Sequence, residues 1–146
     1  MKPEDPASAP DRTPDRKRRI FVVEDHPLMR RSIVEAILRE PDLTVCGQAD
    51  DAPEAPAIVA LEPDAVLTDL QLATSSGLEL IKALRIRQPA LPVVATTMFD
   101  AGRSERLART AGAAGFVSKQ EGPERMIAVL REVLGVGGAN GDGRPD

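Results

Sequence analysis

Short apolar runs alternate along the chain with longer stretches in which apolar residues recur every three or four positions. The short runs are typical of buried parallel strands, and the longer stretches are typical of helices that cover them. Strands are predicted at residues 20–24, 43–47, 65–69, 93–97 and 115–118. Helices are predicted at residues 27–39, 52–61, 78–87, 101–111 and 123–134.

Prolines set the limits of two of these helices. Pro27 stands where a helix start tolerates it, and Pro41 ends the first helix. Pro53 and Pro56 confine the second helix to a late start. Strand and helix alternating five times predict an α/β fold, a doubly wound five-stranded parallel sheet with helices on both faces. The flavodoxin-like strand order 2-1-3-4-5 is usual for a chain of this size.

The folded unit is predicted to run from residue 19 to residue 134. Residues 1–18 hold prolines and alternating charges, so they cannot bury apolar surface and are expected to be disordered. The glycine-rich tail, residues 135–146, is equally unable to pack and is also expected to be disordered.

Composition excludes several classes of protein. The 146 residues are 42% hydrophobic but only 2% aromatic, so aliphatic side chains must build the core. A net charge of −4 argues against general nucleic-acid binding. Cys46 is the only cysteine, which excludes a disulfide framework and fits a reducing compartment. No apolar run approaches the roughly 20 residues of a membrane span, and the N-terminus lacks a secretory signal. A cytoplasmic protein is therefore expected.

Acidic and hydroxyl residues stand at the ends of the apolar runs: Glu24 and Asp25, Asp69, Thr97, and then Lys119. The carboxyl ends of parallel strands meet at one edge of a sheet, where ligands bind. Three carboxylates within about 5 Å of one another would repel by roughly 3 kcal/mol per pair at an effective dielectric near 20. A divalent cation would relieve that repulsion, and a site with only oxygen ligands suits Mg²⁺.

The same residues suit phosphoryl transfer. The Asp69 carboxylate can act as a nucleophile and form an aspartyl-phosphate. Thr97 and Lys119 can supply the hydrogen-bond donor and the positive charge that a phosphoryl group needs. Thr96 competes for the hydroxyl role, and Thr97 is preferred because alternate side chains of a strand face opposite ways. His26 is interpreted as a helix-entry residue and not as a metal ligand or phosphodonor.

Spacing and local sequence together resemble one family. Asp69 follows Asp25 by 44 positions, Thr97 follows Asp69 by 28, and Lys119 follows Thr97 by 22. With the strings Val-Val-Glu-Asp-His-Pro-Leu, Val-Leu-Thr-Asp-Leu, Val-Val-Ala-Thr-Thr-Met-Phe-Asp and Gly-Ala-Ala-Gly-Phe-Val-Ser-Lys, the chain closely resembles the receiver domains of bacterial two-component response regulators. The Asp-His-Pro-Leu and Phe-Val-Ser-Lys-Gln strings are most similar to receivers that often carry a helix-turn-helix output domain. The resemblance covers about residues 19–134.

This resemblance implies roles for the acidic residues. Asp69 matches the phosphoacceptor of the family. Glu24 and Asp25 match the pair that binds Mg²⁺ together with Asp69, and Gln71 occupies the position whose backbone carbonyl completes the protein ligands. Glu24 stands where Asp is more usual, which keeps the charge and adds a methylene group.

Other matches concern the response to phosphorylation. Thr97 matches the switch hydroxyl that turns toward the phosphoryl group, and Lys119 matches the lysine that pairs with that group. Phe116 matches the aromatic residue whose inward or outward rotamer reports activation. The loop after the phosphoacceptor departs from the family pattern, because Ala73 replaces the usual proline and Ser76 replaces the usual acid or amide.

The sequence thus predicts a phosphorylation-activated switch of a two-component or phosphorelay system. A sensor histidine kinase or a phosphotransfer protein would supply the phosphoryl group to Asp69 with Mg²⁺. The chain would catalyse its own phosphoryl transfer and hydrolysis, without turnover of an external substrate. It would act through contacts with a downstream protein target, with no direct nucleic-acid or membrane binding. A phosphorylation-dependent homodimer is left open, because no pattern selects an interface.

Three alternatives accompany this prediction. A truncated receiver of a DNA-binding transcriptional regulator would need about 60 more residues for its output domain. Only the glycine-rich tail follows Leu134, which favours a single-domain regulator. A phosphatase-like hydrolase with an aspartate nucleophile usually needs a second aspartate two residues later, and Gln71 cannot act as an acid or base. A pseudo-receiver that binds partners constitutively is disfavoured by the intact set of site residues.

Overall fold

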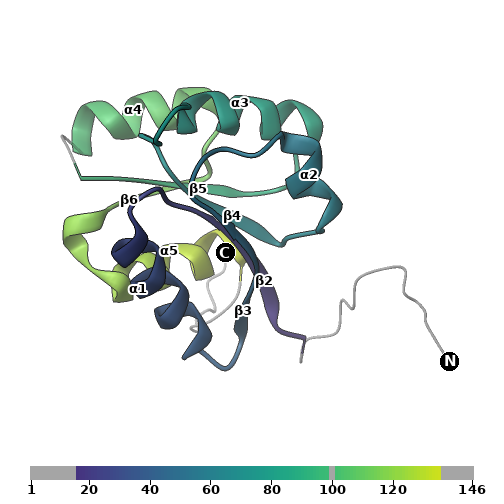
Figure 1. The fold of residues 1–146 in the computed structure, drawn as a ribbon, viewed down its shortest axis with the longest axis vertical. Coiled ribbons are helices and arrows are strands. Elements are labelled where there is room, and N and C mark those ends of the chain that lie inside the picture. Colours follow the sequence, from purple (N-terminus) through teal and green to yellow (C-terminus); the bar gives the residue numbers. More distant parts are fainter. Residues whose placement is uncertain (1–15, 99–100, 136–146) are drawn as a thin grey trace, which may run out of the picture.

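The computed structural model describes residues 16–98 and 101–135. Within them, one sheet of five parallel strands lies between two layers of helices (Figure 1). The strands are β2 (Arg18–Val23), β3 (Leu43–Ala49), β4 (Ala65–Asp69), β5 (Val93–Thr97) and β6 (Gly115–Ser118). Their order across the sheet is β3-β2-β4-β5-β6, which is the predicted flavodoxin-like order.

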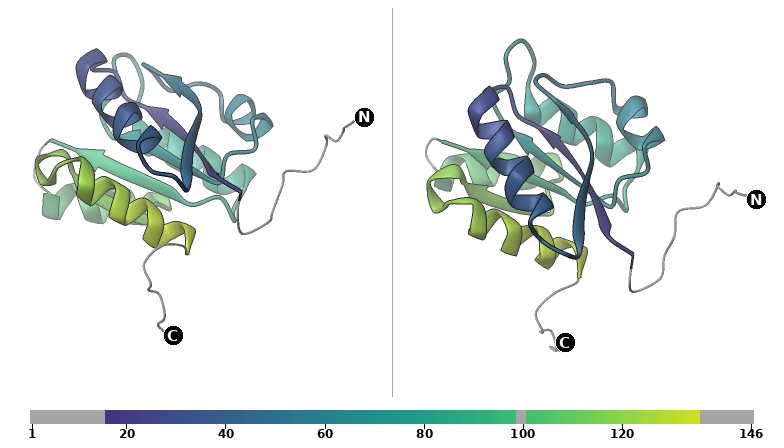
Figure 2. Two further views of the ribbon diagram at one scale, coloured as in Figure 1. Left: turned by 90° about the horizontal axis from the view of Figure 1, so that it is seen from below. Right: turned by 60° about the horizontal axis from the view of Figure 1, so that its bottom comes forward.

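Helices cover both faces of the sheet, as predicted. They are α1 (Pro27–Leu38), α2 (Ala55–Ala60), α3 (Gly77–Arg87), α4 (Ala101–Ala111) and α5 (Pro123–Leu134), with a 3-10 turn, η1, at Lys119–Glu121. In Figure 1, α2, α3 and α4 lie above the sheet, and α1 and α5 lie below it. Figure 2 shows α1 and α5 side by side, in agreement with the contacts between them.

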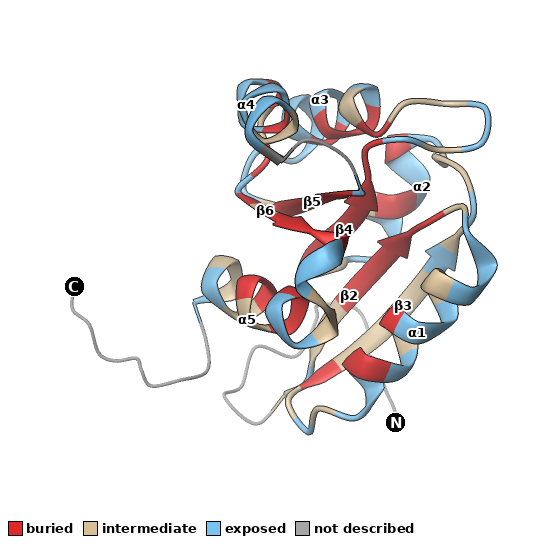
Figure 3. Cartoon of the chain, turned by 90° about the vertical axis from the view of Figure 1, so that its left-hand side faces the viewer, coloured by how far each residue is buried: buried red, intermediate tan, exposed pale blue. Residues whose placement is uncertain are grey.

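The core divides into two clusters, one on each face of the sheet (Figure 3). Successive residues of β2 face opposite ways, so Ile20 and Val22 pack with α1 and α5, whereas Phe21 and Val23 pack with α2 and α3. Every residue of β4 and β5 is buried. Strands that are covered on both faces read as continuous apolar runs in the sequence, which explains why they could be predicted.

The first strand begins earlier than predicted. Strand β2 begins at Arg18, two residues earlier than predicted, and ends at Val23. The preceding Arg16 guanidinium donates two hydrogen bonds of 2.7 Å to the Asp64 carboxylate. The Asp64 carboxylate thus compensates the positive charge of Arg16 just before β2. The predicted boundary of the folded unit at residue 19 stays a prediction. The predicted disorder of residues 1–15 and 136–146 lies outside the described residues and stays a prediction.

Other differences are small and have local causes. Strand β3 extends to Ala49 because its pairing with β2 continues beyond a register shift between Ile20 and Phe21. Helix α2 begins only at Ala55, in agreement with the late start expected from the prolines. The turn η1 was not predicted. No helix in the described part of the chain has the length and apolar character that crossing a membrane requires.

Candidate functional site

Three carboxylates meet at the carboxyl edge of the sheet. Asp69 is the last residue of β4, and Glu24 and Asp25 follow the last residue of the neighbouring strand β2. Each contributes a carboxylate oxygen, and these oxygens all lie within 4.8 Å of one another. The parallel arrangement of β2 and β4 therefore produces the acidic cluster that the sequence predicted.

Lys119 joins this cluster from the end of β6. Its Nζ donates a hydrogen bond of 2.6 Å to Asp69 Oδ2 and lies 2.8 Å from Glu24 Oε1. The Lys119 side chain is 5% exposed, so the contact is shielded from solvent. Ser118 and Glu121 form a capping box at the start of η1, which fixes the backbone on which Lys119 stands.

The Asp69 carboxylate is held by the loop that follows it. The backbone N–H of Gln71 donates to Asp69 Oδ1 at 3.0 Å. That loop turns back sharply, and Gly77 N–H donates to Leu70 O at 2.9 Å. A Cβ at residue 77 would lie 2.1 Å from the carbonyl oxygen of Asp69, so only glycine permits this approach. Gly77 thus lets α3 begin directly behind the phosphoacceptor candidate.

Glu24 is buried, and backbone contacts fix its position. Its N–H donates to Ala49 O at 3.0 Å, and its Oε2 accepts from His26 N–H at 3.2 Å. His26 also caps α1, since its Nδ1 accepts from Met29 N–H at 3.3 Å. The helix-entry interpretation of His26 is therefore confirmed.

The electrostatics of the cluster favour a cation. Burial raises the pKa of Glu24, the hydrogen bond from Lys119 opposes that rise, and the Asp69 charge adds to it. Burial alone would lower the pKa of Lys119, but its hydrogen bonds to Asp69 and Glu24 and the negative charges of these carboxylates together outweigh burial and raise the pKa. The lysine therefore remains an ammonium ion, and the carboxylates beside it favour any further positive charge.

The donor set fits a magnesium ion. Among the described residues, Glu24 Oε1 is buried without a hydrogen bond of favourable geometry, although Lys119 Nζ lies 2.8 Å away. Asp25 is only half-buried and lines a cleft of about 350 Å³ together with Asp69 and Met98. Carboxylate oxygens that open into a small cleft match the preference of Mg²⁺ for few protein ligands and several waters.

The two candidate hydroxyls lie on the next strand. Thr97 is the last residue of β5, and its partner in the sheet is Ser118, which precedes Lys119. Thr96 is the sheet partner of Asp69 in β4. Both threonines are buried. The choice of Thr97 for the hydroxyl role stays a prediction.

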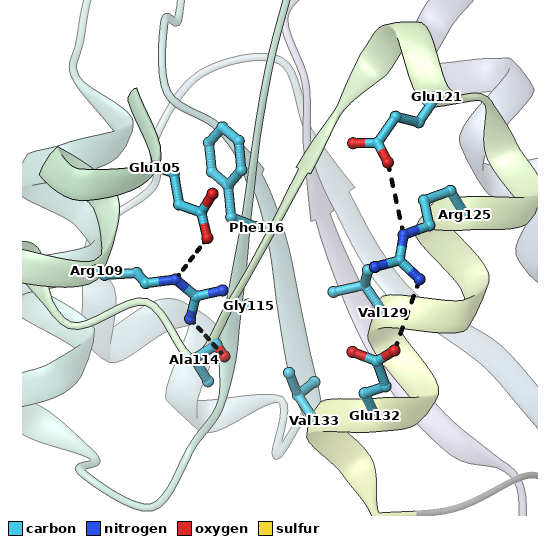
Figure 4. Close-up of a pocket in the computed structure, with 10 residues that line it drawn as sticks. All are labelled: Glu105, Arg109, Ala114, Gly115, Phe116, Glu121, Arg125, Val129, Glu132 and Val133. Atoms are coloured by element: carbon cyan, nitrogen blue, oxygen red, sulfur yellow. Dashed lines mark hydrogen bonds and ion pairs between the residues drawn. The ribbon is translucent and has the colours of Figure 1, made fainter. Parts of the chain in front are cut away.

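Phe116 belongs to strand β6, as Ser118 does, but it lies on a different surface from the acidic cluster. It is half-buried and lines a pocket of about 440 Å³ between α4 and α5. Figure 4 shows its ring beside Glu105, which accepts a hydrogen bond of 2.9 Å from Arg109. We name this surface of α4, β6 and α5 the α4–β6–α5 face. Strand β6 thus connects the acidic cluster at its end with a surface pocket along its side.

A second group of polar residues was missed by the sequence analysis. The Asp51 carboxylate, in the loop after β3, accepts hydrogen bonds from the hydroxyls of Thr74 and Ser75 in the loop after β4. These two hydrogen bonds lower the pKa of Asp51 to about 2. We name this group the loop latch. The only signal in the sequence was the run Thr74-Ser75-Ser76, which by itself does not indicate a partner.

Comparisons with known proteins show the family to which this chain belongs. The family model described as "Response regulator receiver domain" matches residues 20–131. The Pseudomonas aeruginosa response regulator GacA is 34% identical over 117 residues, covering 80% of this chain and 55% of GacA. The DNA-binding transcriptional activator DevR/DosR of Mycobacterium tuberculosis is 32% identical over 116 residues, covering 79% and 54%. The chain spans about half the length of these curated relatives.

Solved structures agree with this result. A two-component response regulator of the LuxR family from an Aurantimonas species has a TM-score of 0.76 and 30% identity, covering 81% of this chain and 85% of that one. The response regulator domain of Thermotoga maritima CheB, at 24% identity and covering 84% and 100%, has a TM-score of 0.75 and shows the shared fold. The chain belongs to the response regulator receiver domain family.

Proposed function

We propose that the chain is a phosphorylation-activated switch that accepts a phosphoryl group on Asp69 from a partner histidine kinase or phosphotransfer protein. One observation carries this proposal: Lys119 Nζ lies 2.6 Å from Asp69 Oδ2, at the edge where three carboxylates gather. A nucleophilic carboxylate beside a fixed cation and a candidate metal site is the arrangement that phosphoryl transfer needs. Membership in the response regulator family supports the same conclusion.

The proposed step is an in-line displacement. An Asp69 carboxylate oxygen attacks the phosphorus of a phosphohistidine on the partner, so that an O–P bond forms while the N–P bond breaks. The electron pair of the broken bond stays on the histidine nitrogen, and the imidazole leaves. Gln71 N–H holds one Asp69 oxygen in place, which limits the orientations of the carboxylate during the attack.

Four groups would hold Mg²⁺: the carboxylates of Glu24, Asp25 and Asp69 and the backbone carbonyl of Gln71. The ion would supply positive charge to the phosphoryl oxygens as negative charge develops on them. Glu24 and Asp25 come from the same strand end, so the metal would tie β2 to β4. Lys119 would provide the second positive charge from β6.

The new phosphoryl group would change the contacts of β5 and β6. Lys119 Nζ donates a hydrogen bond to Asp69 Oδ2 in the unphosphorylated structure. After phosphorylation it would pair with one phosphoryl oxygen, and the Thr97 hydroxyl would donate to another. These contacts would draw the ends of both strands toward Asp69. The α4–β6–α5 face would then repack, with Phe116 as the side chain that changes rotamer. A few kcal/mol of differential contact is enough to invert such an equilibrium.

Substitution of the phosphoacceptor tests the proposal. The wild-type chain is incubated with Mg²⁺ and a small-molecule phosphoryl donor, and intact-protein mass spectrometry counts the acid-labile phosphoryl groups. We expect one group on the wild type and none on Asp69→Asn. Asp42→Asn is the matched control, because Asp42 lies at the opposite edge of the sheet near β3 and should leave phosphorylation unchanged. Uptake of one acid-labile phosphoryl group by Asp69→Asn would disprove the assignment.

The output of the switch has two candidates. A single-domain regulator would act through protein contacts on the α4–β6–α5 face. The receiver part of a longer DNA-binding regulator is favoured by two observations: relatives such as DevR/DosR are DNA-binding activators, and the chain spans about half of their length. An immunoblot of the native host separates the two, since the single-domain form has a mass of 15.6 kDa and a full regulator is markedly heavier.

A further inference from the structure

A hollow between two helices lies on the face opposite α1 and α5. It has a volume of about 480 Å³ and is lined by α3 and α4. Its lining residues are Leu78, Lys82, Arg103, Arg106, Leu107, Thr110 and Ala111, and we name it the α3–α4 groove. Neither the acidic cluster nor the pocket beside Phe116 shares a residue with this groove. A volume of this size can hold several side chains of a bound partner.

The floor of the groove is apolar. Leu107 of α4 is 46% exposed. The other described residues of this helix are polar residues and alanines, apart from Gly102. Leu78 of α3 lies half-buried at the same groove, and the buried Ala111 also lines it. A single exposed leucine is ordinary, but a leucine beside a second leucine in a hollow offers area that a partner could bury.

Basic side chains surround this floor. Three of the seven lining residues are basic, Lys82, Arg103 and Arg106, and none is acidic, although the whole chain carries a net charge of −4. Helices α3 and α4 hold one acidic residue each, and both are already paired, Glu79 with Lys82 at 3.3 Å and Glu105 with Arg109 at 2.9 Å. Within the described residues no carboxylate pairs with Arg106. The rim is therefore positive on an otherwise acidic protein.

We propose that the α3–α4 groove binds a short amphipathic helix of a partner protein that is rich in Asp and Glu. Its apolar side chains lie on Leu78 and Leu107, and its carboxylates face Lys82 and Arg106. Recognition of a helix in a groove combines apolar anchors with flanking charges in this way. The proposal concerns a different surface from the phosphorylation site, so it does not depend on phosphorylation of Asp69.

Two other occupants fit less well. A second copy of the chain in a twofold contact would bring Arg106 and Lys82 against the same cations of its partner, since such an interface pairs a surface with itself. A nucleic acid would meet an apolar floor and a chain whose net charge repels phosphates at long range. An acidic peptide satisfies both the apolar floor and the cationic rim.

The first experiment uses two fluorescein-labelled helical peptides with the same apolar face. Leucines stand at positions i, i+4 and i+7 of both peptides, and the remaining face carries glutamates in one and lysines in the other. Fluorescence anisotropy at low salt should show the glutamate peptide binding at least about tenfold more tightly than the lysine peptide. Its affinity should fall as NaCl is raised, because exposed charges are screened. Equal affinity of the two peptides, or no binding of either, overturns the proposal.

Variants then locate the binding. The double change Lys82→Glu with Arg106→Glu should invert the preference, so that the lysine peptide binds more tightly. Leu107→Ser should weaken both peptides, whereas Arg39→Glu, an exposed position at the end of α1, should change neither. Circular dichroism confirms that each variant is folded.

Two results would assign the groove to another occupant and overturn the proposal. One is a doubling of the mass in solution that Arg106→Glu abolishes, which would indicate a second copy of the chain. The other is binding of a labelled DNA duplex that competes with the glutamate peptide. Amide chemical shifts of the ¹⁵N-labelled protein give the final check, because the peptide should perturb α3 and α4 and leave α1 and α5 unchanged.

Discussion

Lys119 has an unusual position for its residue type. Its side chain is almost completely buried, yet its Nζ contacts the carboxylates of two other strands, Glu24 after β2 and Asp69 on β4. A buried carboxylate without a partner costs several kcal/mol, so the lysine stabilises the fold as well as the site. The same ammonium group therefore serves two purposes at the edge of the sheet.

Lys119→Met should reveal the structural part of this role. The change removes the cation and leaves Glu24 and Asp69 close together without compensation. We expect the free energy of unfolding in Mg²⁺-free buffer to fall by about 3 kcal/mol, and saturating MgCl₂ to restore part of the loss. Urea unfolding with EDTA or with MgCl₂ measures both effects.

Lys82→Met is the matched control, because Lys82 forms an exposed pair with Glu79. It should change stability by less than about 0.5 kcal/mol, with no response to Mg²⁺. If Lys119→Met destabilises the chain no more than Lys82→Met does, the buried lysine does not compensate the carboxylates.

Gly77→Ala should disturb the site through backbone sterics alone. The new methyl group would lie 2.1 Å from Asp69 O, so either the loop or the end of β4 must shift. We expect a loss of about 2–3 kcal/mol in the free energy of unfolding and slower phosphorylation of Asp69.

Gly135→Ala is the comparison, because nothing lies within 4 Å of its Cβ and only its positive φ is strained. It should cost about 1 kcal/mol and leave phosphorylation unchanged. Equal effects of both changes would exclude a special role for Gly77.

Elements differ in how far the sequence predicts them. The bounds of β4, β5 and β6 were predicted correctly, because each is a continuous apolar run that ends at a polar residue. The start of β2 was missed because it lies among basic residues, and Asp64, far away in the sequence, compensates the charge of the preceding Arg16. Long-range ion pairs leave no periodic signal, so a local pattern cannot show them.

The same limit applies to the candidate site. The convergence of Asp69, Glu24 and Asp25 could be predicted from strand ends alone, since topology brings them to one edge. The contact between Lys119 and Glu24 could not, because it depends on the length and burial of both side chains. The loop latch could not be predicted either, because it joins two loops and the sequence of neither loop has a pattern that fixes the loop's conformation.

The loop latch should hold the segment that follows Asp69, the proposed phosphoacceptor. Asp51 accepts from Thr74 and Ser75, and Ser75 Oγ in turn accepts from Ala52 N–H at 3.1 Å. Ala73 stands in the same loop where the family usually has a proline, so the latch replaces a backbone restraint with side-chain hydrogen bonds. We expect Asp51→Ala to speed amide hydrogen exchange at residues 71–75 and to weaken Mg²⁺ binding, because Gln71 belongs to that loop.

Hydrogen exchange followed by mass spectrometry measures the first effect, and calorimetric titration with Mg²⁺ measures the second. Asp50→Ala is the control, since the neighbouring Asp50 is exposed and outside the latch. Unchanged exchange at residues 71–75 in Asp51→Ala would show that the latch does not restrain the loop.

At the scale of the whole molecule, one arginine ties the last helix to the edge of the sheet. Arg131 of α5 donates to Glu40 Oε1 at 2.6 Å and to Asp42 Oδ1 at 2.7 Å. Both acidic residues lie just before β3. The contact joins residues 89 positions apart in the sequence. The hydrogen bond from Arg131 is the main reason why the pKa of Asp42 lies below its usual value, although burial opposes it. Helix α5 also packs on β6, so this tie supports the part of the fold that carries Lys119.

Arg131→Met should therefore lower the free energy of unfolding by about 1 kcal/mol at neutral pH and low salt, since a forked contact with two carboxylates exceeds an ordinary surface pair. The Asp42 pKa is lower in the folded chain than in the unfolded one, so its contribution is complete above the ordinary value of 3.8 and is lost as pH falls through the lowered pKa. Urea unfolding should show that the difference in unfolding free energy between wild type and variant disappears at acidic pH and becomes smaller at high salt.

Arg31→Met, which removes an exposed pair with Glu35, should cost less than about 0.5 kcal/mol at any pH. A gap for Arg131→Met that persists unchanged into acid would mean that the arginine stabilises α5 by packing and not by charge.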